Sequence, residues 1–220
     1  MLSWLFGRRV IASKRGALDL PDGPFRFVAL DVETANGNVA SICQIGIACV
    51  GFAGEMSVHS TLVNPKQAFD PFNTGLHGID AHAVKTAPDF PRVYTEIAPL
   101  LGQHLIFQHS SFDRRAIYAS CEAHGVAEPD WLWADSVQVA RRAWPEFKGN
   151  GGHGLAHLKR ALDLEFTHHD AGEDAKAAAL VVLAAERKTG ARLEELIGPK
   201  PRPPKVKRVQ SPPADVASDG

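Results

Sequence analysis

The feature that most constrains this chain is a pair of carboxylates at the end of an apolar run. Phe27–Leu30 predicts a buried strand, and Asp31 and Glu33 follow it two residues apart. Side chains at i and i+2 of a strand share one face, so both acids lie on the face of Phe27 and Ala29. Like charges in a half-buried setting repel unless a cation such as Mg²⁺ or Mn²⁺ lies between them. A solvated strand end is the alternative, because Asp-x-Glu is a common tripeptide.

A third acid, Asp113, lies in the first turn of a predicted helix. Leu105–Phe107 predicts a short buried strand, and the helix runs from Phe112 to about His124 and stops at Gly125. Asp113 shares a mostly apolar helix face with Ala116, Ile117, Ser120 and Cys121. We therefore expect it to point inward, although an acid in a first turn also suits the helix dipole.

The fourth acid, Asp174, lies on the core-facing stripe of a long helix. Asp170 and Glu173 resemble a capping box before this helix, which ends near Gly190. Asp174 shares its face with Ala178, Val181, Val182 and Ala185. A carboxylate on such a stripe needs a partner. His169 stands just before the helix, where it can lean over whatever Asp174 binds, and His168 could take the same role.

Four inward-facing acids with a histidine beside them predict a two-metal phosphodiesterase site. Two divalent ions about 3.5–4 Å apart can activate a water, stabilise the leaving oxygen and clamp the phosphate. A histidine near the first ion can take the proton from the attacking water.

Three short motifs resemble those of the DEDDh 3′–5′ exonucleases. They are Asp31-Val-Glu33-Thr34, Phe112-Asp113 and His169-x-Ala171-x-x-Asp174, in the family's order and spacing. This family includes epsilon-type proofreading subunits of DNA polymerase III, RNase T and the oligoribonucleases. The resemblance covers about residues 25–187. It implies an α/β fold of the RNase H-like type: a mixed five-stranded sheet, its second strand antiparallel, flanked by helices.

The resemblance also implies a role for each acid and for the histidine. Asp31 would bridge two divalent cations, Mg²⁺ or Mn²⁺. Glu33 and Asp174 would serve the metal that holds the attacking water, and Asp113 would support the second metal. His169 would be the general base.

Three further residues are expected to contact the substrate. Thr34 would approach the 3′-terminal nucleotide. His77, in a Leu-His-Gly-Ile segment, would lie near the terminal base or sugar, or would be only a turn residue. Phe112 would stack on a base, or would belong to the core. The family often has His-Asn before the second motif where this chain has Gln108-His109.

Composition fits one intracellular domain with tails. The chain has 220 residues, 45% hydrophobic and 22% charged, and a net charge of −1, which does not indicate nucleic-acid binding by bulk electrostatics. Its three cysteines lack metal spacing, which favours buried free thiols in a reducing cytosol. No stretch is long enough to span a membrane. We therefore expect a cytoplasmic protein without a membrane contact.

Three regions follow from the pattern along the chain: an N-terminal extension (1–24), an exonuclease domain (25–190), and a basic, Pro-rich tail (191–220) expected to be extended. The tail is either a solubilising terminus or an arm that holds nucleic acid or a partner. Beyond the elements named above, we expect strands at Ile42–Val50, Met56–Val63 and Trp131–Trp133, helices at Val93–Leu101, Ser136–Ala143 and Leu155–Leu162, and a long connection at Pro65–Pro91.

The leading functional hypothesis is a metal-dependent exonuclease that releases nucleoside 5′-monophosphates from the 3′ end of single-stranded DNA. An RNA-directed enzyme of the same chemistry is the second hypothesis. The third is a non-catalytic scaffold in a polymerase or repair assembly, although a scaffold has no physical need for a costly acidic cluster.

Overall fold

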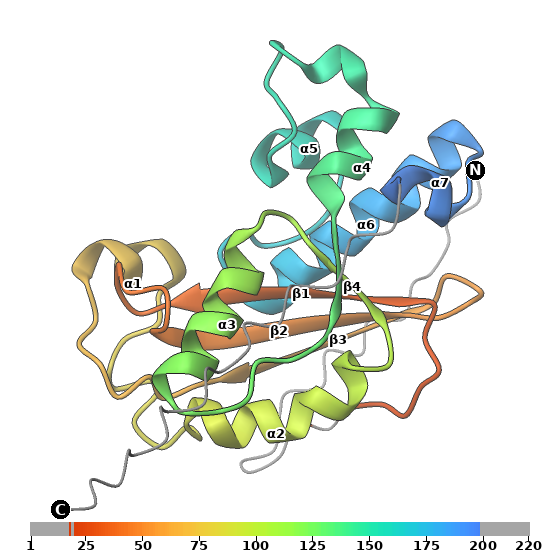
Figure 1. Cartoon of the computed structure of the whole chain (residues 1–220). Coiled ribbons are helices and arrows are strands. Elements are labelled where there is room, and N and C mark those ends of the chain that lie inside the picture. Colours follow the sequence, from red (N-terminus) through yellow and green to blue (C-terminus); the bar gives the residue numbers. More distant parts are fainter. Residues whose placement is uncertain (1–17, 19, 199–220) are drawn as a thin grey trace, which may run out of the picture.

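The computed structural model describes residue 18 and residues 20–198, and its five strands form one mixed sheet (Figure 1). The spatial order is β3-β2-β1-β4-β5. The strands are β1 (Phe27–Thr34), β2 (Ile42–Val50), β3 (Met56–Leu62), β4 (Leu105–Gln108) and β5 (Leu132–Asp135). Within this part of the chain β2 is antiparallel to both of its neighbours, and β1, β4 and β5 run parallel. The predicted RNase H-like sheet, with its second strand antiparallel, is confirmed.

Helices cover both faces of this sheet. They are α1 (Pro71–His77), α2 (Phe90–Leu101), α3 (Phe112–Ala123), α4 (Ser136–Ala143), α5 (Leu155–Ala161), α6 (Ala171–Thr189) and α7 (Leu193–Ile197), with a 3-10 turn at Pro145–Phe147. The long helix α6 and α4 pack on one face, whereas α2 and α3 pack on the other (Figure 1). Within the described residues, no helix has both the length and the apolar character that a bilayer span requires.

Strand β1 separates two hydrophobic cores by the alternation of its side chains. Phe27 and Ala29 belong to the core shared with α6, whereas Val28, Leu30 and Val32 belong to the core shared with α2 and α3. Because side chains alternate along a strand, this register directs the acids that follow Ala29 toward α6. The fold therefore delivers the β1 carboxylates to the face on which α6 begins.

The structure differs from the predicted organisation in two places. The connection from Pro65 to Pro91 contains α1, whose N-cap Asp70 accepts a hydrogen bond from the Phe72 N–H (2.8 Å). Packing continues beyond residue 190, because Leu193 and Leu196 of α7 are buried in the core that contains α4 and α6. The basic, Pro-rich segment from residue 199 onward lies outside the described residues, as do residues 1–17 and 19.

Candidate active site

Three carboxylates meet where β1 ends and α6 begins. Asp31 and Glu33 lie near the end of β1, and Asp174 lies in the first turn of α6. One ligand oxygen from each can be chosen so that all three lie within 4.8 Å of one another. Oxygens at this spacing can share one hard cation.

Asp113 joins these acids from the first turn of α3, on the other side of β1. It is buried, as predicted, and its Oδ1 accepts a hydrogen bond from the backbone N–H of Val32 (3.2 Å). It lines the same pocket as the other three acids. Asp113 does not belong to the tight group of three, so the structure gives it a separate position about β1.

Burial and mutual repulsion make these acids hard to ionise in the protein alone. Burial raises the pKa of Glu33 and of Asp113 to about 7. Burial also raises the pKa of Asp31 well above its usual range, with Asp113 and Asp174 as the next causes, and burial raises the pKa of Asp174. Carboxylates held this way bind either protons or a cation. The donor set, oxygen only and rich in negative charge, therefore fits a divalent metal ion.

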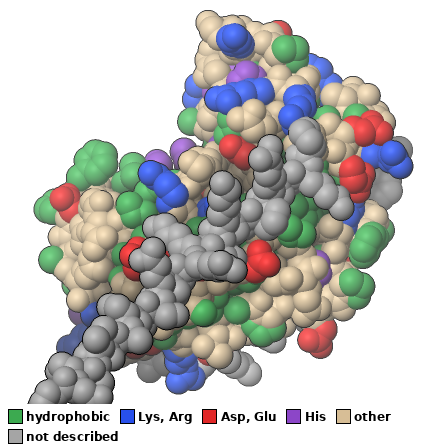
Figure 2. Space-filling view, in the orientation of Figure 1, with side chains coloured by type: hydrophobic (Ala, Val, Ile, Leu, Met, Phe, Trp, Pro, Cys, Tyr) green, Lys and Arg blue, Asp and Glu red, His purple; other side chains and the backbone are tan. Residues whose placement is uncertain are grey.

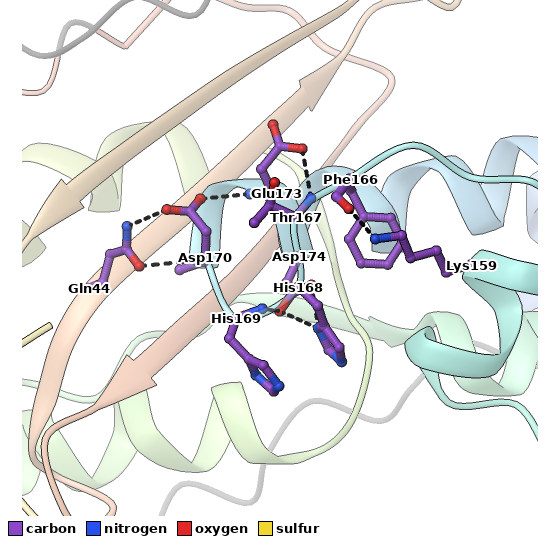
Figure 3. Close-up of polar contacts among 10 residues, drawn as sticks. Gln44, Lys159, Phe166, Thr167, His168, His169, Asp170, Glu173 and Asp174 are labelled. Atoms are coloured by element: carbon purple, nitrogen blue, oxygen red, sulfur yellow. Dashed lines mark hydrogen bonds and ion pairs between the residues drawn. The ribbon is translucent and has the colours of Figure 1, made fainter. Parts of the chain in front are cut away.

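The two histidines before α6 have different partners (Figure 3). His168 Nδ1 lies 3.0 Å from both carboxylate oxygens of Asp174. His169 instead donates its backbone N–H to Oδ2 of Asp174 (2.9 Å), with a positive φ of 66°. The two rings stack with centroids 4.1 Å apart, and one ring nitrogen of each histidine can be chosen within 4.8 Å of an Asp174 oxygen.

The His169 side chain remains available to a ligand. Among the described residues, neither of its ring nitrogens forms a hydrogen bond, and the residue lines the pocket. Burial, and then the neighbouring His168, lower the pKa of the His169 imidazole. A lowered pKa favours the neutral ring, which can accept a proton. This geometry favours His169 over His168 for the role that sequence alone left open between them.

The three residues expected to contact substrate are placed differently. Thr34 and Phe112 line the pocket, and Phe112 also packs against the core. His77 is not among the lining residues. Its Nε2 donates to the carbonyl of Thr34 (3.2 Å), and its Nδ1 accepts from the N–H of Ile79 (3.0 Å). Both ring nitrogens are thus used inside the protein, which favours a structural role for His77 as the last residue of α1 over a contact with the substrate.

The pocket that holds the acids has a volume of about 460 Å³. Its walls include residues that sequence reasoning did not select: Asn36, Gly37, Val39, Asn73, Leu76, Ser110 and Leu155. His109, noted as a departure from the family pattern, also lines it. The His109 ring lies between Ser136 Oγ (2.8 Å) and the carbonyl of His153 (2.9 Å). The pocket is therefore lined by many residues besides the four acids and the two histidines before α6.

Gln44 of β2 is a positioning residue that sequence reasoning missed (Figure 3). Its Nε2 donates to Asp170 Oδ2 (3.0 Å), and its Oε1 accepts the N–H of Ala171 (3.1 Å). Gln44 thus ties the start of α6 to the strand beside Glu33, its register partner on β1. The signal was a lone amide in the otherwise apolar strand Ile42–Val50, because a buried amide needs partners.

Close backbone packing reinforces this connection at Gly46. A Cβ at Gly46 would lie 2.0 Å from the carbonyl oxygen of Ala171, so only glycine fits. The predicted capping box is only half formed. Asp170 accepts from the Glu173 N–H (3.0 Å), but the Glu173 carboxylate accepts from Thr167 N–H (3.4 Å) instead of returning to Asp170.

Comparison with known proteins agrees with this arrangement of motifs. The sequence matches the exonuclease family RNase_T over residues 28–182, which is most of the chain. The chain belongs to this exonuclease family. The resemblance predicted from the three short motifs is thereby confirmed.

Relatives of this chain include longer proteins. It is 28% identical over 163 residues to the 3′-5′ exonuclease DinG of Bacillus subtilis, covering 72% of this chain and 17% of DinG. It is also 28% identical over 155 residues to the PolC-type DNA polymerase III of Bacillus cereus, covering 69% of this chain and 11% of PolC. The chain thus spans less than a fifth of these curated relatives.

Solved exonuclease structures share the fold. Exonuclease X in complex with 5′ overhanging duplex DNA superimposes with a TM-score of 0.63 at 23% identity, covering 78% of this chain and 97% of that one. The nuclease domain of 3′hExo, a DEDDh family member bound to rAMP, gives a TM-score of 0.65 at 16% identity, covering 82% and 100%. At these identities the likeness establishes the fold.

Proposed function

We propose that this protein is a metal-dependent 3′–5′ exonuclease that removes nucleoside 5′-monophosphates from the 3′ end of single-stranded DNA. The observation that carries the proposal is the convergence of four carboxylates and the His169 side chain in a single pocket. Relatives named as a 3′-5′ exonuclease and as DNA polymerases support the reaction and favour DNA.

The carboxylates would hold two divalent cations, Mg²⁺ or Mn²⁺. In this proposal Asp31, Glu33 and Asp174 hold the first ion, and Asp113 supports the second together with Asp31. Ions bound there would neutralise the scissile phosphate and favour attack by water. Val32 contributes by fixing the Asp113 carboxylate through its backbone N–H.

His169 would act as the general base. Its neutral ring can accept the proton of the attacking water at a free ring nitrogen, a role worth about 10²–10⁴-fold in rate for such groups. His168 would instead orient Asp174 through Nδ1, as hydrogen-bonded second partners of metal ligands do. Thr34 and Phe112, which line the pocket, would contact the terminal nucleotide.

An RNA-directed activity is the second candidate. It is favoured by the fold shared with 3′hExo bound to rAMP. The chemistry at the carboxylates is the same for both polymers, and selection depends on whether the site accepts or needs a 2′-OH. We keep a polymerase or a repair protein as the proposed partner, because the relatives include PolC-type DNA polymerases.

Metal binding should stabilise the protein, and more so at high pH. Because the pKa values of Glu33 and Asp113 are raised to about 7, the folded state binds more protons than the unfolded state between about pH 4 and 7. This contribution to stability is present at low pH and is lost as pH rises through 7. Mn²⁺ replaces those protons, so we expect thermal unfolding to show a shift of several degrees at pH 8 and a much smaller one at pH 5.

The control for this experiment is Asp31→Asn, which removes one carboxylate ligand of the proposed metal site. We expect Mn²⁺ to give little shift in this variant at either pH. A Mn²⁺ shift of equal size in both proteins, or one that does not depend on pH, would contradict the proposed site.

Gln44→Met should weaken the site without unfolding the protein. The substitution leaves the Ala171 N–H without its acceptor and frees Asp170, so the start of α6 loosens against β2. We expect a loss of about 10–100-fold in activity or metal affinity, as for other residues that orient ligands. The measurement is the Mn²⁺ concentration that gives half the maximal rate. Gln138→Met, on the exposed side of α4, is the matched control, and an equal effect of both changes would reject the positioning role.

A further inference from the structure

Helix α1 exposes two large apolar side chains beside the candidate active site. Phe72 is 76% exposed and Leu76 is 43% exposed, and they lie four residues apart on one face of the helix. None of the residues of α1 is buried. Figure 2 shows hydrophobic side chains on the surface around this helix. The apolar face of α1 therefore contributes little to the core, and its exposure needs a reason elsewhere.

This helix is held firmly against the end of the catalytic strand. Asn73 Nδ2 donates to the carbonyl of Thr34 (2.9 Å), and His77 Nε2 donates to the same oxygen (3.2 Å). The Asp70 N–H, just before the helix, donates to the carbonyl of Ala35 (2.8 Å). One side of α1 is thus fixed to the residues directly after Glu33, and the Phe72 and Leu76 side chains are left exposed.

The apolar face continues into the pocket of the acids. Leu76 and Asn73 line that pocket together with Asp31 and Glu33. Phe72 is one turn before Leu76, so it extends the same wall outward from the site. If the 3′ end of a single-stranded nucleic acid enters the pocket, the nucleotides before that end would therefore lie within reach of this wall.

We propose that Phe72 and Leu76 form a stacking platform for the unpaired nucleobases that precede the 3′-terminal nucleotide. The proposal rests on the proposed function and adds a substrate-binding surface to it. Each base has an aromatic face, so such a platform binds single strands without reading their sequence. Stacking would also supply affinity that electrostatics does not, because the chain has a net charge of −1 and offers little bulk attraction to phosphates.

The first test compares Phe72→Ala with Phe52→Ala. Phe52 is 70% exposed in the turn between β2 and β3, away from the pocket lining, and serves as the matched control. Two substrates are used: a single-stranded oligonucleotide, and the p-nitrophenyl ester of thymidine 5′-monophosphate, which has one base only. We expect the ratio of kcat/KM for the oligonucleotide to that for the ester to fall about 5-fold or more with Phe72→Ala, through KM.

Oligonucleotides with one abasic site then locate the contact. In the wild type, removing the base that stacks on α1 should raise KM by the same factor, whereas Phe72→Ala should be insensitive to that abasic position. Phe72→Trp should keep the wild-type ratio. An unchanged ratio in Phe72→Ala, or an equal fall in Phe52→Ala, would overturn the platform and leave α1 as a surface for a protein partner.

A binding measurement separates failure of the platform from failure of the proposed function. Fluorescence anisotropy of a labelled oligonucleotide is measured with Asp31→Asn and with Asp31→Asn carrying Phe72→Ala, neither of which needs turnover. Affinity that falls about 5-fold in the second protein supports the platform even if the wild type cleaves nothing. Equal affinity in the two proteins rejects the platform even if the wild type is an active exonuclease.

Discussion

We expect the replacement of Asp31 by Asn to abolish the proposed exonuclease activity while the fold remains. Burial, and then its neighbours Asp113 and Asp174, raise the pKa of Asp31 well above its usual range, and Asp31 belongs to the tight group of three carboxylates. Loss of a shared ligand should remove several kcal/mol of transition-state stabilisation, or at least about 10³-fold in rate. The measurement is the initial rate on a 5′-labelled oligonucleotide in Mg²⁺ and in Mn²⁺.

The same substitution should not destabilise the metal-free protein. It removes a half-buried carboxyl group whose ionisation is opposed by burial and by Asp113 and Asp174, so its melting temperature in EDTA should equal or exceed that of the wild type. Asp130→Asn, at an exposed position, is the matched control and should leave the rate unchanged. A rate within about tenfold of wild type for Asp31→Asn would contradict the assignment of this acid.

Substitutions of the two histidines before α6 should differ in the size and in the kind of their effects. His169→Ala removes the proposed base, and we expect a fall of about 10²–10⁴-fold in kcat with little change in the Mn²⁺ requirement. His168→Ala removes the partner of Asp174, so the half-saturating Mn²⁺ concentration should rise, with a loss of about 10–100-fold at low metal.

An exposed histidine gives the control for both changes. His82→Ala lies in the turn after α1 and should behave as the wild type. If His168→Ala lowers kcat at saturating Mn²⁺ more than His169→Ala does, the two roles are reversed. If neither substitution lowers kcat, then neither side chain is the base.

The periodicity of apolar residues predicted most of the helices and strands, because packing on both faces of the sheet requires that periodicity. Strand Ile42–Val50 was predicted with the bounds found, since each of its residues is buried between β1 and β3. The long helix after Asp170 could be predicted in the same way, because its sequence carries a stripe of Ala and Val that faces the core and includes Asp174. Both signals come from many residues that agree.

Features that depend on contacts between residues far apart in the sequence could not be predicted from the sequence. Helix α1 has no buried residue and hence no core-facing stripe that would indicate a helix, and it is held by bonds to Thr34, more than thirty residues earlier. The role of Gln44 requires knowledge that α6 begins beside β2, 127 residues later. Likewise, only the fold shows that His168 Nδ1 lies against Asp174, whereas the ring nitrogens of His169 form no hydrogen bond within the described residues.

One measurement tests the central claim most directly. Matched 5′-labelled single-stranded DNA and RNA oligomers are incubated with the protein in Mg²⁺, Mn²⁺ or EDTA, beside the His169→Ala variant. We predict a ladder that shortens from the 3′ end, requires metal and is lost in the variant, with DNA cleaved faster than RNA. Absence of cleavage of both polymers in either metal would contradict the exonuclease proposal and would leave the protein as a scaffold that keeps the fold.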